Sequence, residues 1–243
     1  IGSLSFDNSQ NDQHIGDALN LTLVNVELIK SKNFKVVVDA VNSTGGILVP
    51  KLLEKLGVEC IKLYCDPNGE FPHNPEPLPE NLQEISKMVI STNSDLGIVV
   101  DPDVDRLALV CEDGSMFGEE YTLVSVSDYV LSKTPGNTVS NLSSTRALAD
   151  ITKKYNCEYH ASAVGEVNVV EKMKLCNAVI GGEGNGGVIY PELHYGRDAL
   201  VGIALFLSNL AEKNISSLNL RNSYPNYFIS KNKLDLDPNT DID

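Results

Sequence analysis

Short apolar runs alternate with amphipathic segments through the first half of the chain. Apolar, largely β-branched or aliphatic runs bounded by turn residues predict buried strands at 34–38, 60–64, 96–100 and 107–111. Apolar residues at helical spacing predict helices at 14–30, capped by Asp12, and at 47–56 and 80–90. Alternation of strand and helix is typical of a parallel α/β sheet.

The same alternation begins again after the turn at Glu112-Asp113-Gly114-Ser115. Helices are expected at 119–131, 145–155 (capped by Ser144), 166–174 and 198–213, and strands at 138–142, 157–163 and 178–182. The pattern therefore predicts an α/β fold with two similar mixed α/β domains, at 1–112 and 113–218. Residues 219–243 are polar with little periodicity, which indicates a linker toward a missing C-terminal domain.

Charge and composition narrow the functional classes. The net charge of −14 disfavours a nucleic-acid partner, because nucleic acid needs a basic face. No apolar run approaches the ~20 residues of a membrane-spanning helix and no signal peptide is visible, so we expect a cytoplasmic protein without a membrane partner. The five cysteines contain no C-x-x-C pair, so we expect reduced thiols.

Three carboxylates follow the predicted strand at 96–100 in the segment Asp101-Pro102-Asp103-Val104-Asp105-Arg106, called here the acidic loop. Ligands of open α/β sheets bind beyond the carboxyl ends of the strands. Carboxylates held so close repel one another unless a cation lies between them, and an all-oxygen site suits Mg²⁺ or Ca²⁺ rather than zinc. Arg106 adds a planar cation suited to phosphate. A solvated acidic turn is the plainer alternative.

The acidic loop also resembles two other kinds of site. An EF-hand loop would need glycine where Arg106 stands and helices on both sides, whereas strands are expected here, so it is rejected. A haloacid-dehalogenase-like phosphatase would use Asp101 as nucleophile and Asp103 as general acid and base. That family adds a downstream lysine and acidic pair, and no convincing pair follows here.

A second candidate is Gly182-Glu183-Gly184-Asn185-Gly186-Gly187, called here the glycine loop. It follows a predicted strand, and its glycines allow close approach of a ligand to the backbone. The carboxylate of Glu183 can accept hydrogen bonds from two neighbouring sugar hydroxyls. From the residues alone, a tight turn with Glu183 facing water explains the same pattern equally well.

Four separated segments resemble, in order, motifs of the α-D-phosphohexomutase family, which includes phosphoglucomutase, phosphomannomutase and phosphoglucosamine mutase. They are 36–42 with Gly45-Gly46, the proline-rich 71–77 with 79–82, the acidic loop (similar to D-P-D-G-D-R), and the glycine loop in the place of E-x-S-G-H. The order and spacing match the family's middle domains, II and III, from about residue 34 to about 213.

The resemblance implies a function for each loop. Mg²⁺ would be held by Asp101, Asp103 and Asp105, with Arg106 as a catalytic residue that steadies the transferred phosphoryl group. Glu183, Asn185 and Gly187 would bind the sugar phosphate substrate.

The resemblance also implies the reaction. Hexose 1-phosphate and 6-phosphate would interconvert through a phosphoserine and a bisphosphate intermediate. The nucleophilic serine motif and the last phosphate-binding loop would belong to missing N- and C-terminal domains, so this chain alone is expected to be inactive. A non-catalytic sugar- or metal-binding module remains an alternative.

The chain departs from the family pattern at a few positions. Val104 replaces glycine, so the acidic loop is expected to avoid a positive φ there, or to offset the strain elsewhere. Asn185 and Gly187 replace serine and histidine, and Ala163 stands where the family often has lysine. Arg197 is a further candidate for phosphate binding, although a surface arginine is the favoured interpretation.

Overall fold

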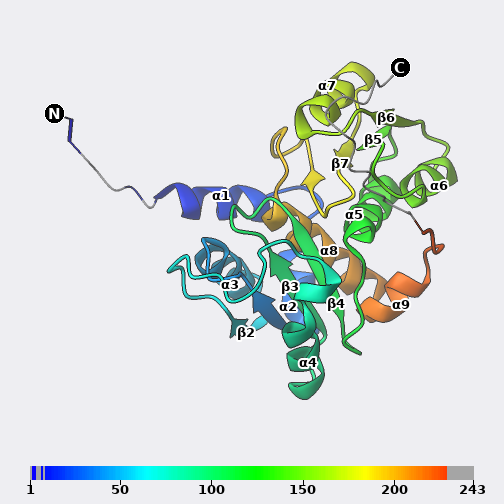
Figure 1. The fold of residues 1–243 in the computed structure, drawn as a ribbon. Helices are drawn as coiled ribbons and strands as arrows, with labels where there is room; N and C mark the ends of the chain where they lie inside the picture. Colours follow the sequence, from blue (N-terminus) through cyan, green and yellow to red (C-terminus); the bar gives the residue numbers. More distant parts are fainter. Residues whose placement is uncertain (1, 4–6, 8, 229–243) are drawn as a thin grey trace, which may run out of the picture.

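The computed structural model describes residues 2–3, 7 and 9–228. Two four-stranded sheets form the fold, one from each half of the chain (Figure 1). Their strands are β1 (Lys35–Asp39), β2 (Glu59–Leu63), β3 (Leu96–Val100), β4 (Leu107–Cys111), β5 (Thr138–Asn141), β6 (Tyr159–Ser162), β7 (Ile180–Gly182) and β8 (Val188–Ile189).

The two sheets have the same topology. Their strand orders are β2-β1-β3-β4 and β6-β5-β7-β8, and in each sheet the first three strands are parallel and the last is antiparallel. The acidic loop joins β3 to β4, and the glycine loop joins β7 to β8, so the two loops occupy equivalent places in the two halves. The expected pair of similar mixed α/β units is confirmed, and the boundary near residue 113 stays a prediction.

Helices cover the sheets and join them. They are α1 (Ser9–Leu19), α2 (Val26–Lys32), α3 (Gly45–Lys55), η1 (Pro79–Asn81, a 3₁₀ turn), α4 (Gln83–Ser91), α5 (Glu119–Lys133), α6 (Ala147–Lys154), α7 (Glu166–Cys176), α8 (Ala199–Lys213) and α9 (Ser217–Asn222). Helix α8 is buried on nearly all sides because it packs against α1, α2 and α5 and contacts β4 and β8 (Figure 1). One apolar core therefore runs through both halves.

The N-terminal helix differs from its prediction. Instead of one helix over 14–30, the chain forms α1 and α2, and Asp12 lies inside α1 rather than at its cap. The break arises because Asn25 caps α2, its side chain accepting a hydrogen bond from the Leu28 N–H at 3.0 Å. Ser144 does not cap α6 either, since its hydroxyl donates to Asn141.

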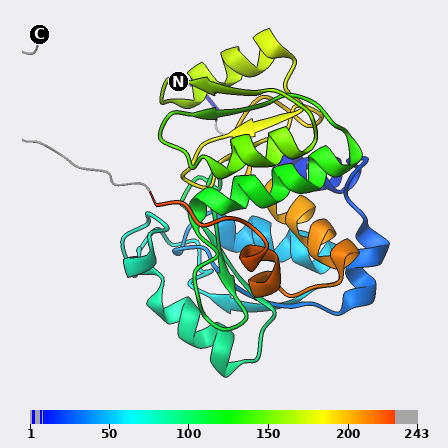
Figure 2. The ribbon, with the colours of Figure 1, turned by 90° about the vertical axis from the view of Figure 1, so that its right-hand side faces the viewer.

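The stretch expected to be a linker begins as packed structure. Residues 217–222 form α9, in which Leu220 is fully buried. The hydroxyl of Tyr121 then donates to the carbonyl of Pro225 at 2.6 Å, which holds the following segment against α5 (Figure 2). Burial of one face of a short helix outweighed its polar composition. Residues 229–243 lie outside the described residues.

No helix in the described part of the chain is long and apolar enough to cross a membrane. All five cysteines are free thiols.

Candidate functional site

The acidic loop turns sharply at the end of β3, and Asp101 organises the turn. One oxygen of this buried carboxylate, Oδ1, accepts hydrogen bonds from the backbone N–H groups of Asp105 (3.1 Å) and Arg106 (3.0 Å). Burial raises the pKa of Asp101 to about 7, opposed by the Arg106 N–H and reinforced by the charges of Asp105 and Asp103. The loop therefore concentrates negative charge that its own hydrogen bonds do not fully compensate.

The three aspartates converge as the sequence indicated. Asp101, Asp103 and Asp105 each place a carboxylate oxygen within 4.8 Å of the others. Oδ1 of Asp105 is buried and has no hydrogen-bond partner, and the Nε of Arg106 lies 3.8 Å from it and 3.4 Å from Oδ2 of Asp101. An unpartnered buried oxygen among three carboxylates fits a hard divalent cation, which takes oxygen ligands.

Val104 adopts the left-handed conformation, with φ 62°. The expectation that valine would avoid a positive φ was wrong. The other expectation applies, namely that contacts elsewhere offset the backbone strain. The Val104 N–H donates to the Asp101 carbonyl at 3.1 Å, its own carbonyl accepts the Ala199 N–H at 3.0 Å, and its side chain is buried. These contacts hold valine in a conformation that costs roughly 1–2 kcal/mol.

We expect Val104→Gly to be no less stable than Val104→Ala, although glycine removes more buried carbon. Alanine loses packing and keeps the backbone strain, whereas glycine loses packing and relieves the strain, by roughly 1 kcal/mol. Denaturant unfolding of both variants measures the order. Val100, buried in β3, is the matched control, where glycine should be the less stable variant. The same order at both positions would contradict the strain at Val104.

The glycine loop holds Glu183 as a buried acceptor. Its Oε1 accepts from the Asn141 amide (2.7 Å) and the Gly165 N–H (3.3 Å), and its Oε2 accepts from Arg197 (2.6 Å). Asn185 turns its side-chain oxygen toward the Gly187 N–H at 3.2 Å. Glu183 therefore does not face water, which removes the plainer interpretation of this residue.

The neighbouring side chain of Arg197 explains why glycine stands at position 187. A Cβ at this position would lie 2.4 Å from Cδ of Arg197, so a larger residue would displace the arginine. Space that a histidine side chain would occupy in the family pattern is here taken by Arg197. The departure at Gly187 is therefore coupled to a cation supplied from elsewhere in the chain.

Arg197 is largely buried, whereas its sequence favoured an exposed position. Only 15% of its side chain is exposed, and it is no ordinary surface arginine. Its Nη2 lies 2.5 Å from Oδ2 of Asp105, and its Nη1 lies 2.6 Å from Oε2 of Glu183. The backbone N–H of Arg197 donates to Oε1 of Glu166 at 2.9 Å. Arg197 thus joins the acidic loop to the glycine loop.

The backbones of the two loops also meet. Leu107 donates its N–H to the carbonyl of Gly186 at 3.1 Å, and Arg106 and Gly187 form an antiparallel bridge. Gly186 has φ 89°, and a Cβ there would lie 2.4 Å from the Leu107 carbonyl oxygen. The structure therefore brings all the expected site residues into one region between the two halves.

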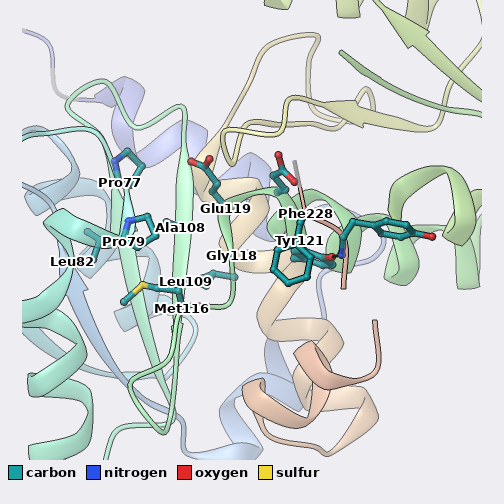
Figure 3. Close-up of a pocket in the computed structure, with 12 residues that line it drawn as sticks. Pro77, Pro79, Leu82, Ala108, Leu109, Met116, Gly118, Glu119, Tyr121 and Phe228 are labelled. Carbon is teal, nitrogen blue, oxygen red and sulfur yellow. Dashed lines mark hydrogen bonds between the residues drawn. The ribbon is translucent and has the colours of Figure 1, made fainter. Parts of the chain in front are cut away.

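A separate cavity lies away from this region. It has a volume of about 480 Å³, with Pro77, Pro79 and Leu82 on one wall and Tyr121 and Phe228 on the other (Figure 3). None of the acidic-loop or glycine-loop residues lines it. The chemistry-bearing residues, rather than this cavity, therefore define the candidate site.

Two family models match successive parts of the chain. The first, phosphoglucomutase/phosphomannomutase alpha/beta/alpha domain II, matches residues 12–114, and the second, domain III of the same family, matches residues 118–227.

Several curated relatives are about one-third identical to the chain. A phosphoglucomutase/phosphomannomutase of Thermococcus kodakarensis is 34% identical over 86% of this chain and 46% of the relative. A phosphoglucosamine/phosphogalactosamine mutase of Sulfurisphaera tokodaii is 32% identical over 97% of this chain and 53% of the relative. The chain thus spans about half the length of the curated relatives it matches.

Solved structures agree with this likeness. A phosphoglucomutase/phosphomannomutase family protein of Burkholderia thailandensis has a TM-score of 0.79 and 31% identity, covering 89% of this chain and 46% of that one. A putative phosphomannomutase of Thermus thermophilus has a TM-score of 0.81 at 21% identity, covering 88% and 49%, which shows a shared fold. These matches support the phosphohexomutase interpretation and not the haloacid-dehalogenase alternative. The chain belongs to the phosphoglucomutase/phosphomannomutase family and comprises its domains II and III.

Proposed function

We propose that this chain supplies the metal-binding and sugar-binding loops of a phosphohexomutase that interconverts hexose 1-phosphate and hexose 6-phosphate. Glucose, mannose and glucosamine phosphates are the candidate substrates. Domains that precede and follow this part in the longer relatives would supply the phosphoserine and a further phosphate-binding loop. The proposal depends most on one observation: the guanidinium of Arg197 pairs with Asp105 of the acidic loop and with Glu183 of the glycine loop, which brings the two loops together.

The acidic loop is the proposed Mg²⁺ site, with Asp101, Asp103 and Asp105 as ligands. When bound, Mg²⁺ would neutralise charge on the oxygens of the phosphoryl group being transferred. Two backbone hydrogen bonds to Asp101 fix the position of its carboxylate. Arg106 is the proposed catalytic cation, because its guanidinium beside Asp101 is placed to bind phosphoryl oxygens at the same point.

The glycine loop is the proposed sugar site. Glu183 would accept hydrogen bonds from two sugar hydroxyls, and Asn185 would donate and accept through its amide. Gly187 would contact the sugar only if Arg197, which fills the space beside it, moves. Because Glu183 now accepts from Arg197, sugar binding would require that contact to be shared or exchanged. The bisphosphate intermediate could then bind in either orientation through the same hydroxyl contacts.

We expect Arg197→Ala to bind Mg²⁺ about tenfold more tightly and hexose phosphate more weakly. Removing a cation beside Asp105 makes the potential at the metal ligands more negative, whereas Glu183 loses the donor that holds its Oε2. Calorimetric titrations with each ligand measure the two effects. Arg146→Ala, at an exposed position, is the control that should change neither affinity. Weaker Mg²⁺ binding in Arg197→Ala would contradict the expectation that Arg197 and Mg²⁺ compete for Asp105.

The proposal is tested on the longer polypeptide that contains this chain. Purified protein is assayed with glucose 1-phosphate, mannose 1-phosphate and glucosamine 1-phosphate, each with catalytic bisphosphate and Mg²⁺. Production of a 6-phosphate, with a phosphoserine found by mass spectrometry, is the expected result. Hexose phosphate binding without turnover would favour a non-catalytic module, and a trapped phospho-aspartate at Asp101 would favour a phosphatase. This chain on its own should give no turnover.

A further inference from the structure

A second group of metal-ligating side chains lies outside the two loops. It consists of His14 on α1, His194 after β8, and Asp198 at the start of α8. Nε2 of His14 lies 2.7 Å from Oδ2 of Asp198, and Nε2 of His194 lies 3.0 Å from the same oxygen. Among the residues described, this is one of two groups whose ligand atoms all lie within 4.8 Å of one another.

The donor types differ from those of the acidic loop. Two imidazole nitrogens and one carboxylate oxygen form a set that zinc and similar transition metals prefer, whereas three carboxylates suit Mg²⁺. In a tetrahedral zinc site with ligand distances of ~2.0 Å, neighbouring ligand atoms are ~3.3 Å apart. The two nitrogen–oxygen distances here, 2.7 and 3.0 Å, are a few tenths of an ångström shorter than this, and the ligand atoms of the two histidines lie within 4.8 Å of each other.

The surroundings hold the ligands and leave them accessible. Oδ1 of Asp198 accepts the N–H groups of Leu200 (2.7 Å) and Val201 (3.2 Å), which fixes the carboxylate and leaves Oδ2 for the histidines. The side chains of His14 and His194 are 36% and 42% exposed, and a cavity of about 210 Å³ adjoins all three residues. A fourth ligand, such as water, has room to enter.

We propose that His14, His194 and Asp198 form a binding site for Zn²⁺. His14 belongs to the first half of the chain, and His194 and Asp198 belong to the second, so the bound ion fastens α1 to the beginning of α8. Its ligands are not those of the acidic loop, although Asp103 and Val104 of that loop line the same cavity. The proposal does not depend on the function proposed above. With three protein ligands and an open position, it has the composition of an accessible rather than a fully enclosed zinc site.

Titration of the metal-stripped chain with Co²⁺, followed by displacement with Zn²⁺, tests the proposal. We expect one Co²⁺ to bind with the intense visible absorption of a tetrahedral complex, and Zn²⁺ to abolish that absorption. His14→Ala and His194→Ala should each lower Zn²⁺ affinity at least tenfold, because each removes one of three ligands. Thermal unfolding should show a Zn²⁺-dependent rise in Tm in the original chain that both variants lose.

Two controls separate this site from other possibilities. His160→Ala removes another histidine that lies 3.6 Å from a carboxylate, on Glu158, and should bind Zn²⁺ as before. Asp103→Asn removes an exposed proposed ligand of the acidic loop at little cost to the fold and should leave the Co²⁺ spectrum unchanged. The proposal is overturned if the original chain binds no stoichiometric Zn²⁺, or if His14→Gln and His194→Gln, folded by circular dichroism, bind it with full affinity.

Discussion

Replacing Asp103 with asparagine is expected to weaken Mg²⁺ binding by about a hundredfold, or ~2.8 kcal/mol. Asp103 is exposed, so the substitution removes one of three proposed ligand charges at little cost to the fold. Asp101 would be a poorer choice, because its buried carboxylate also holds the turn through two backbone N–H groups. In the longer polypeptide, turnover at limiting Mg²⁺ should fall in proportion and recover partly as Mg²⁺ is raised.

Competition between Mg²⁺ and Mn²⁺, followed by electron paramagnetic resonance, measures the affinity of each variant. Asp113→Asn is the matched control, since it removes the same charge from an exposed aspartate in the turn after β4. Equal losses in the two variants would show a general effect of net charge rather than a metal ligand. An unchanged affinity in Asp103→Asn would remove Asp103 from the proposed site.

Asp128→Ala is expected to lower the free energy of unfolding by roughly 3 kcal/mol at neutral pH. This buried carboxylate on α5 accepts from four donors that belong to other segments: Lys154 (3.1 Å), Tyr155 (2.9 Å), Lys213 (2.7 Å) and Tyr224 (3.2 Å). Its loss removes the common partner of α6, α8 and the segment after α9, and leaves the buried hydroxyl of Tyr224 without its acceptor.

The same residue predicts a dependence on pH. Burial raises the pKa of Asp128, but hydrogen bonding to Lys213 and its charge, together with Tyr155 and Lys154, bring the pKa below its usual value. A lowered folded-state pKa gives stability that is present above the unfolded value of ~3.9 and is lost as pH falls through the folded value. The difference between the original chain and Asp128→Ala should therefore shrink below about pH 4.

Urea unfolding at several pH values measures this difference. Asp17→Ala, at an exposed position on α1, is the control and should change stability by less than about 0.5 kcal/mol. A difference for Asp128→Ala that stays constant from neutral to acid pH would contradict an ionised, hydrogen-bonded carboxylate in the folded state.

Local patterns of apolar and polar residues predicted most of the fold. The strand Leu96–Val100 is buried at every position, and its continuous apolar run predicted this directly. The acidic loop could be predicted equally well, because its three carboxylates are close in sequence and directly follow that strand. Repetition of the strand and helix pattern after residue 113 likewise predicted the second unit.

Contacts between distant segments explain what the sequence did not reveal. Arg197 and Asp105 are 92 positions apart, and no motif spacing links them. His14 reaches Asp198 only because α1 packs against α8. Val104 holds a positive φ partly through a hydrogen bond from Ala199, the first residue of α8. The sequence near Arg197 gave one indication of its role. This cation directly precedes Asp198, the aspartate that caps the strongly apolar helix α8.

The most direct measurement is an anomalous-scattering map from a crystal of the chain soaked in Mn²⁺, which takes the same oxygen ligands as Mg²⁺. The proposed metal site predicts a peak bonded to Asp101, Asp103 and Asp105, with Arg197 moved from Asp105 or still bound to its outer oxygen. A crystal that shows no peak there, with the three carboxylates turned apart, would contradict the account.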